Sequence, residues 1–176
     1  MYSPGGPKYC AIWSFDAIIG DMDSLNAIDR LILNELQADG HLPNVTLAKR
    51  VGLSPSAALR RVRRLEATGV IERYVALVDP RAVNRDTAVL VEISLTSQEE
   101  SVLEAFEAAL VECPEVMSCR LMAGEADYLI HMACADVRDY ERIHRTHLAE
   151  MPGVAKIKSS FALRTVCDRT AYDMTQ

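Results

Sequence analysis

The chain has 176 residues, which is enough for one large domain or for two small domains with modest cores. Hydrophobic residues make up 49% and charged residues 25%, a globular composition that excludes the disordered, collagenous and membrane-embedded classes. The net charge of −6 is unevenly spread: residues 1–43 carry −4, residues 44–73 carry +5 and residues 74–176 carry −7. Because salt screens distant charges over about 10 Å, the basic segment can serve as a docking face for an anionic polymer.

The sequence contains no apolar run of about 18 residues, and Asp16 interrupts the one apolar stretch near the N-terminus. We therefore expect neither export nor membrane insertion, and a cytoplasmic location. The cysteines are odd in number, form no CxxC pair and have no histidine at zinc spacing, which predicts reduced thiols and no metal or cofactor. They are Cys10, Cys113, Cys119, Cys134 and Cys167.

The sequence of residues 1–68 predicts a tail followed by three helices. Residues 1–22 show no helical or strand period and are interpreted as a tail. Apolar residues at helical spacing from Leu25, closed by a glycine, predict a helix over about 24–38. Asn44 is expected to cap a short second helix, and Ser54-Pro55 to start a third helix that ends near Thr68.

The third helix carries four of the seven basic residues of the segment 44–73. With Leu59 as the reference on a helical wheel, the buried stripe is expected to comprise Ala58, Leu59, Val62 and Leu65. Small residues and arginines face the other way, an arrangement that lets a helix approach the major groove and offers bidentate donors to guanine or phosphate. The alternative is a solvated arginine-rich face. The short turn before Ser54 and the confinement of the charge to these helices favour a helix-turn-helix and DNA binding. The residues expected at the DNA are Ser54, Ser56, Ala57, Arg60, Arg61, Arg63 and Arg64.

Residues 70–78 are β-branched and partly alternating, which predicts a short strand or hairpin arm that could also link two domains. Beyond it the apolar period alternates between two and about 3.6, in the order β-α-β-β-α-β. The last helix is expected to bury Val137, Tyr140, Ile143, His144, Leu148 and Met151, and the last strand to span 154–166. This order predicts a ferredoxin-like sheet with both helices on one face, so the whole chain is α+β. The other face is partly apolar, and we expect a second copy of the chain to cover it.

Several stretches together form a pattern that resembles one family. They include Ile28-Asp29-Arg30, Leu47-Ala48-Lys49-Arg50-Val51-Gly52-Leu53-Ser54-Pro55, Arg61-Val62-Arg63-Arg64-Leu65-Glu66, Ala76-Leu77-Val78-Asp79-Pro80 and Met122-Ala123-Gly124-Glu125-Ala126-Asp127-Tyr128. From about Asp23 to Thr170 the chain is similar to the Lrp/AsnC (feast/famine) family of transcription regulators. The resemblance implies a winged helix-turn-helix over 23–73, a linker strand over 74–86, a ferredoxin-like effector-binding and oligomerisation domain over 87–170, and a short tail over 171–176.

The resemblance also implies a DNA-binding homodimer that assembles further, to a tetramer or octamer, and responds to a small amino acid. Loop N–H groups would bind its carboxylate and Asp127 its ammonium, although a turn-capping role for Asp127 is the alternative. Glu125 and Ala126 depart from the aspartate and the aromatic residue that many relatives carry, which affects the size of the pocket. The implied effector residues are Leu121, Met122, Gly124, Glu125, Ala126, Asp127, Val137, Ala149, Ser160, Phe161 and Ala162.

Other chemistry finds little support in the sequence. His144 and His147 are spaced for a metal, but no third ligand accompanies them and helix packing is the preferred interpretation. No phosphate-binding loop or nucleophile elbow occurs, so we expect no enzymatic activity. Two alternatives remain: a siroheme-decarboxylase-like enzyme, which shares this two-part architecture but is expected to lack the arginine face, and an amino-acid sensor module that does not bind DNA.

Overall fold

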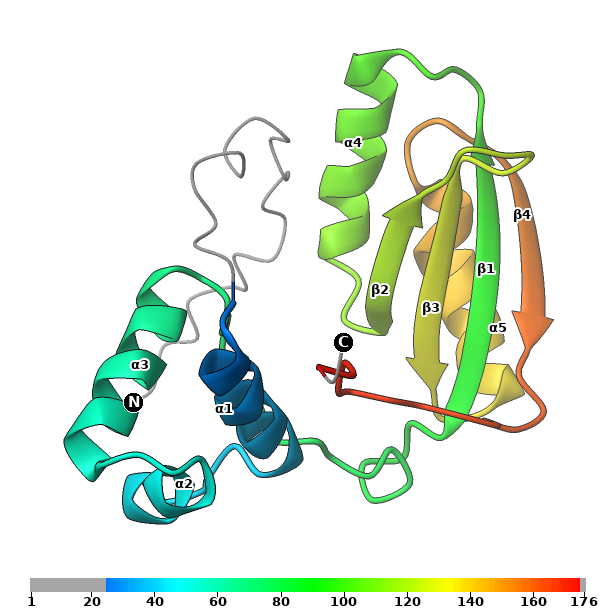
Figure 1. Ribbon diagram of the computed structural model, residues 1–176. Coiled ribbons are helices and arrows are strands. Elements are labelled where there is room, and N and C mark those ends of the chain that lie inside the picture. The colour runs from blue at the N-terminus through cyan, green and yellow to red at the C-terminus, as the bar shows by residue number, and fades with distance from the viewer. Residues whose placement is uncertain (1–24, 175–176) are drawn as a thin grey trace, which may run out of the picture. The chain divides into compact units, whose positions relative to one another are not determined.

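The computed structural model describes residues 25–174, which form two compact units (Figure 1). Residues 25–77 and 166–174 make up the helical unit, and residues 78–165 make up the sheet unit. The predicted N-terminal tail lies outside the described residues. Within the described residues, no helix is long and apolar enough to span a bilayer.

The helical unit contains the three predicted helices, α1 (Ala27–Ala38), α2 (Asn44–Arg50) and α3 (Pro55–Ala67). Asn26 caps α1 by a capping box: its side chain accepts from Asp29 N at 3.0 Å, and its own N–H donates to the Asp29 carboxylate at 3.4 Å. This cap is why α1 begins at Ala27 rather than near residue 24. The core of the unit is a cluster of Ile32, Leu33, Leu47, Val51 and Leu65.

The turn between α2 and α3 differs in one detail from the prediction. Asn44 does not cap α2: it is the first helical residue, and its amide Nδ2 donates across the turn to Pro55 O at 2.8 Å. Gly52 adopts a left-handed φ of +69° that lets the chain turn sharply. Ser54 caps α3 as predicted, with its Oγ accepting from Ala57 N at 3.3 Å. These contacts fix where α3 begins.

The strand predicted over residues 70–78 is not formed. These residues are mostly exposed, and no segment among the described residues pairs with them, whereas a strand needs a neighbour for its ladder bonds. Tyr74 is nevertheless held, since its ring lies against Gly40 and its hydroxyl donates to Glu66 Oε1 at 3.1 Å. The segment therefore leaves the helical unit from a fixed point.

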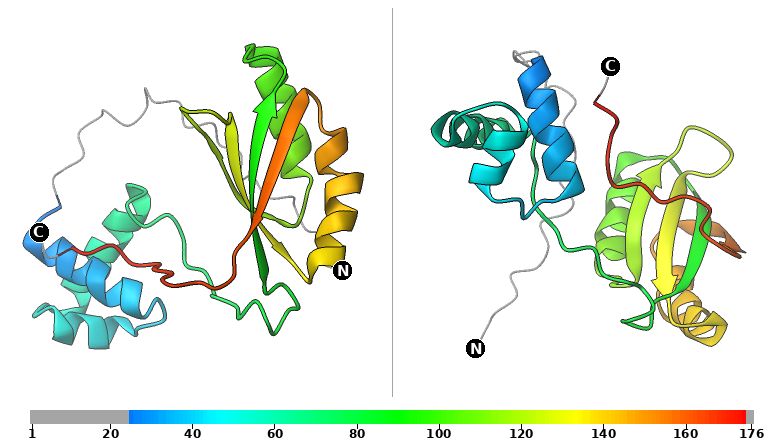
Figure 2. Two further views of the ribbon diagram at one scale, coloured as in Figure 1. Left: turned by 90° about the vertical axis from the view of Figure 1, so that its right-hand side faces the viewer. Right: turned by 60° about the horizontal axis from the view of Figure 1, so that its bottom comes forward.

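The sheet unit has the predicted βαββαβ order, with a short 3-10 helix before the last strand. Its strands pair antiparallel in the order β2-β3-β1-β4, which is the ferredoxin-like topology, and helices α4 and α5 lie on the same face (Figure 2). The elements are β1 (Thr87–Leu95), α4 (Glu100–Val111), β2 (Val116–Leu121), β3 (Tyr128–Cys134), α5 (Val137–Thr146), η2 (Leu148–Glu150) and β4 (Val154–Phe161).

The register decides which side chains of the sheet are buried. Val89, Val91 and Ile93 of β1 face the helices and are fully buried, whereas Leu90 between them is exposed on the open face. Val137 was expected in this core but is 62% exposed, because α5 starts at the end of the sheet, just beyond the last β1–β3 pair. β4 stops at Phe161 instead of continuing to residue 166: Phe161 pairs with Val89, one further bond joins Ala162 N to Ala88 O at 3.0 Å, and β1 itself begins one residue earlier, at Thr87.

The C-terminal segment returns to the helical unit. The carboxamide of Gln37 on α1 pairs with the main chain of Tyr172, donating to its carbonyl at 3.1 Å and accepting from its N–H at 2.8 Å. Met174 packs against the helical core. The structure therefore groups residues 166–174 with the helical unit, whereas the resemblance assigns residues up to 170 to the effector domain.

Gly153 offers a test of the turn before β4. Its φ is +74°, and an added Cβ would lie 2.5 Å from Val102 Cγ1. We expect Gly153→Ala to lower the free energy of unfolding by about 2 kcal/mol in urea titrations. Gly124→Ala is the matched control, since nothing lies within 4 Å of its added Cβ, and it should change stability by less than about 0.5 kcal/mol. Equal stability of the two variants would contradict this account of the turn.

Candidate nucleic-acid interface and ligand site

The exposed face of α3 combines small residues at its N-terminus with two outward arginines. Ser54, Ser56, Arg60 and Arg63 are exposed, and Ala57 is half-buried beside them. Arg60 and Arg63 form no hydrogen bond or ion pair with any residue that the structure describes. Their guanidinium groups are therefore available to an external anion.

Arg61 and Arg64, the other two predicted DNA contacts, are engaged inside the unit. Arg61 Nη1 donates to Asp29 Oδ1 at 2.9 Å, and Arg64 Nη2 donates to Asp29 Oδ2 at 2.6 Å. Asp29 lies on α1 and its side chain is fully buried. The four arginines therefore divide into an outward pair and an inward pair.

This division changes the predicted helical wheel. Ala58 and Leu65 are buried and Val62 is half-buried, as expected, but Leu59 is 39% exposed. The inner face is centred on residues 58, 61, 62 and 65, which follow the helical spacing of three and four. The inner face is thus rotated away from Leu59 and toward Arg61, which lies about 160° from Leu59 around the helix.

Sequence reasoning missed Asp29 as a functional candidate, although a signal was present. Asp29 stands at an inner position of α1, between Ile28 and Ile32, where the spacing calls for an apolar side chain. A carboxylate on such a stripe needs a cationic partner, because an unpaired buried charge is costly. The arginine-rich helix α3 can supply that cationic partner.

The predicted effector loop joins β2 to β3. Met122 N donates to Asp127 O at 2.8 Å and Asp127 N donates to Ile93 O at 2.9 Å, so the loop is tied to its own base and to β1. The Asp127 carboxylate accepts from Leu95 N and from Gln98 Nε2, each at 2.7 Å. Both donors lie outside the loop, so the carboxylate anchors the loop to the end of β1 and to the segment that follows it. A carboxylate has about four acceptor positions, so the one at Asp127 can still receive further donors.

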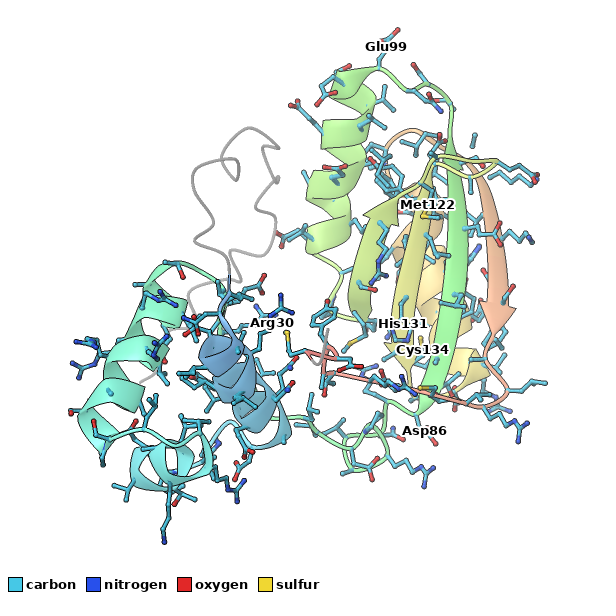
Figure 3. The ribbon with its side chains drawn as sticks, in the orientation of Figure 1. Arg30, Asp86, Glu99, Met122, His131 and Cys134 are labelled. Atoms are coloured by element: carbon cyan, nitrogen blue, oxygen red, sulfur yellow. The ribbon has the colours of Figure 1, made fainter. Side chains whose placement is uncertain are left out.

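One chain does not bring all the predicted effector residues together. Met122 lies at one end of the sheet and Cys134, shortly before Val137, lies at the other end (Figure 3). Asp127 adjoins Ile93, whereas Phe161 pairs with Val89, four residues away along β1 or roughly 13 Å. Leu121, Met122, Gly124, Glu125, Ala126 and Asp127 therefore share one end, Val137, Ser160, Phe161 and Ala162 the other, and Ala149 lies in η2.

A shallow hollow lies on the open face of the sheet, and only two of its residues belong to the predicted set. Two ion pairs cross it, Lys158 with Glu92 at 3.0 Å and Lys156 with Glu125 at 3.9 Å. Its lining comprises Glu92, Ser94, Glu125, Ala126, Lys156 and Lys158. Charged groups of both signs around a polar hollow are suited to a zwitterion.

The remaining candidates are structural. His144 is half-buried, with its ring edge-on to Tyr140 at 6.0 Å, and the described residues contain no group of three metal-binding side chains. Burial raises the pKa of the Cys113 and Cys134 thiols to about 11. At neutral pH these two thiols are protonated and unreactive.

Comparison with known proteins also divides the chain into two domains, although the second match extends into residues 166–172, which the structure groups with the helical unit. Residues 25–72 match the family of winged helix-turn-helix DNA-binding domains, and residues 88–172 match the Lrp/AsnC ligand binding domain. The chain is 41% identical over 143 residues to a leucine-responsive regulatory protein of Haemophilus influenzae, covering 81% of this chain and 86% of the relative. A second such protein, from Salmonella typhimurium, is 42% identical over 142 residues, or 81% of this chain and 87% of the relative.

Solved structures give the same result. A transcriptional regulator of Neisseria meningitidis in complex with L-Met superimposes with a TM-score of 0.82 at 34% identity, covering 86% of this chain and 98% of that one. A feast or famine regulatory protein of M. tuberculosis complexed with L-methionine has a TM-score of 0.77 at 33% identity, with coverage of 85% and 99%.

A helix-turn-helix joined to a ferredoxin-like ligand-binding unit defines a DNA-binding transcriptional regulator. The chain belongs to the Lrp/AsnC family of such regulators. The relatives described above are named as regulators, and none of them is named as an enzyme.

Proposed function

We propose that the chain regulates transcription by inserting α3 into the major groove of duplex DNA, with Arg60 and Arg63 as its principal contacts. The observation that carries the proposal is that these two guanidinium groups project from the side of α3 opposite its core, next to small residues. Arginine donates to guanine edges or to phosphate oxygens, and small neighbours allow the helix to approach. We also propose a cytoplasmic location, because a regulator must share the compartment of the DNA that it binds.

Removal of the two outward arginines tests the assignment. In binding to a duplex of random sequence, each arginine neutralises phosphate charge and releases counterions, so an Arg60→Ala/Arg63→Ala variant should bind such a duplex at least about tenfold more weakly at low salt. The measurement is fluorescence anisotropy of a labelled duplex. Arg145→Ala removes an exposed arginine from α5 of the sheet unit and is the control. Unchanged affinity in the double variant would remove α3 as the contact helix.

We further propose that the sheet unit binds a free amino acid at the β2–β3 loop. The regulators of Neisseria meningitidis and M. tuberculosis are named as complexes with methionine, which supports an amino-acid effector. In this chain the carboxylate of Asp127 has spare acceptor positions for an ammonium group, and the loop supplies main-chain N–H groups for a carboxylate. Because the second group of predicted residues lies at the far end of the sheet, its members would complete the site from a neighbouring copy.

Ligand-induced thermal shifts test this site. A screen of the twenty amino acids should find one that raises the melting temperature of the protein, since a bound ligand stabilises the folded state by mass action. Asp127→Ala should abolish that rise, because the charged hydrogen bond that it removes contributes roughly 1.5 to 3 kcal/mol to ligand binding. It should leave the affinity for DNA within about twofold, since Asp127 lies in the sheet unit.

Gln98→Ala is the control for the ligand site, since it removes one bond to the Asp127 carboxylate and keeps the carboxylate itself. It should retain the ligand-induced rise in melting temperature. A normal dose response in Asp127→Ala would place the effector elsewhere.

We also propose that the open face of the sheet packs against a second copy of the chain, giving a homodimer that assembles to a tetramer or octamer. Leu90 stands exposed in the centre of this face, between β3 and β4. An apolar side chain at the centre of an uncovered sheet is stabilised when another sheet buries it. The charged pair beside it, Lys158 with Glu92, can be met by complementary charges of the second copy.

A charge placed in this face should weaken assembly. We expect Leu90→Glu to shift the protein toward the monomer in light scattering, because burying an unpaired carboxylate costs several kcal/mol. Leu163→Glu is the matched control, since Leu163 is 99% exposed and lies beyond the end of β4. An unchanged molar mass for Leu90→Glu would exclude this face as the contact.

A further inference from the structure

We propose that Asp29 is a positioning residue for the DNA-binding surface. Its buried carboxylate binds Arg61 and Arg64, and these two ion pairs set the rotation of α3 about its own axis. In this rotation Arg60 and Arg63 point outward. The inference rests on the proposed function and deepens it. It assigns two of the four arginines of α3 to holding the helix rather than to the duplex.

The Asp29 carboxylate has donors from both α1 and α3. Asp29 has no exposed surface, and each of its oxygens accepts from a different arginine, Oδ1 from Arg61 and Oδ2 from Arg64. Oδ2 also accepts from Asn26 N, so the same group closes the N-terminal turn of α1. The carboxylate therefore links the first turn of α1 to the middle of α3.

The spacing of the arginines on α3 relates the direction of the inward pair to that of the outward pair. Arg61 and Arg64 are three residues apart, so one carboxylate holds the helix at two points about 4.5 Å apart along its axis. At about 100° per residue, the midpoint between Arg60 and Arg63 lies roughly 100° around the helix from the midpoint of the inward pair. Fixing the inward pair therefore fixes the direction of the outward pair.

The buried charge of Asp29 requires the two inward arginines. A fully buried carboxylate is tolerated when cations and hydrogen bonds compensate it, and removing one partner of such a group is strongly destabilising. The side chains of Arg61 and Arg64 are 27% and 41% exposed, but the Asp29 carboxylate between them is fully buried, so both ion pairs are less screened by salt than a surface pair. The inward pair thus belongs to the internal structure of the unit, whereas Arg60 and Arg63 remain in solvent.

The test compares single alanine variants of the four arginines and Asp29→Asn in the full chain. Affinity for a random-sequence duplex is measured against KCl concentration, well below the melting temperature of every variant. Each phosphate contact contributes about 0.9 to the slope of log K against log salt. We expect Arg60→Ala and Arg63→Ala to reduce the slope by about that amount per subunit and to leave the melting temperature within about 2 °C.

Arg61→Ala, Arg64→Ala and Asp29→Asn should behave in the opposite way. We expect the melting temperature to fall by about 10 °C and the affinity to fall severalfold with an unchanged salt slope, because the outward arginines are still present but misdirected. In an Asp29→Asn/Arg64→Ala variant the fall in melting temperature should be smaller than the sum of the two single effects. If Asp29→Asn does not fold, the single arginine variants still decide the question.

Equal loss of slope in all four arginine variants would overturn the positioning role and leave the DNA-binding proposal standing. Unchanged melting temperatures for Arg61→Ala and Arg64→Ala would also overturn it. If the wild-type chain shows no salt-dependent binding to duplex DNA, the proposed function fails and the positioning role fails with it.

Discussion

The helical unit depends on a buried charge that is shared between two helices. Asp29 completes the capping box of α1 and binds two arginines of α3, so the same carboxylate contributes to the start of one helix and to the orientation of the other. An apolar residue at this position would pack but would not select one rotation of α3, whereas a carboxylate bound at two points does. Two of the four arginines of α3 therefore form ion pairs inside the unit, and the other two, Arg60 and Arg63, carry the positive charge on the outer face of the helix.

Local sequence signals were sufficient for most of the fold. Ser54-Pro55 specified the start of α3 through a cap and a ring that suits the first helical position, and the change of apolar period specified the βαββαβ order. The strand over residues 70–78 was the exception. Its composition is suited to a strand, but pairing is a long-range property that one chain does not supply at this segment.

The site was less predictable than the fold because it depends on contacts between distant residues. A helical wheel places Arg61 and Arg64 relative to the axis of α3, yet it carries no information about the carboxylate 32 and 35 residues earlier in the chain. In the same way, the loop before Tyr128 was recognisable as a turn, while its attachment through Leu95 and Gln98 required the fold. Residues at opposite ends of one sheet share a site only through another copy, and a single sequence does not display that relation.

The return of the C-terminal segment to α1 makes the helical unit discontinuous along the chain. Gln37 binds the main chain of Tyr172 on both its donor and its acceptor, much as a neighbouring strand would. A fragment that ended near Leu77 would lack this segment and would expose the part of the core that Met174 covers. Between residues 25 and 174 the polypeptide therefore passes from one unit to the other twice, near residue 78 and near residue 166, and a protease cut near residue 78 would leave the units joined near residue 166.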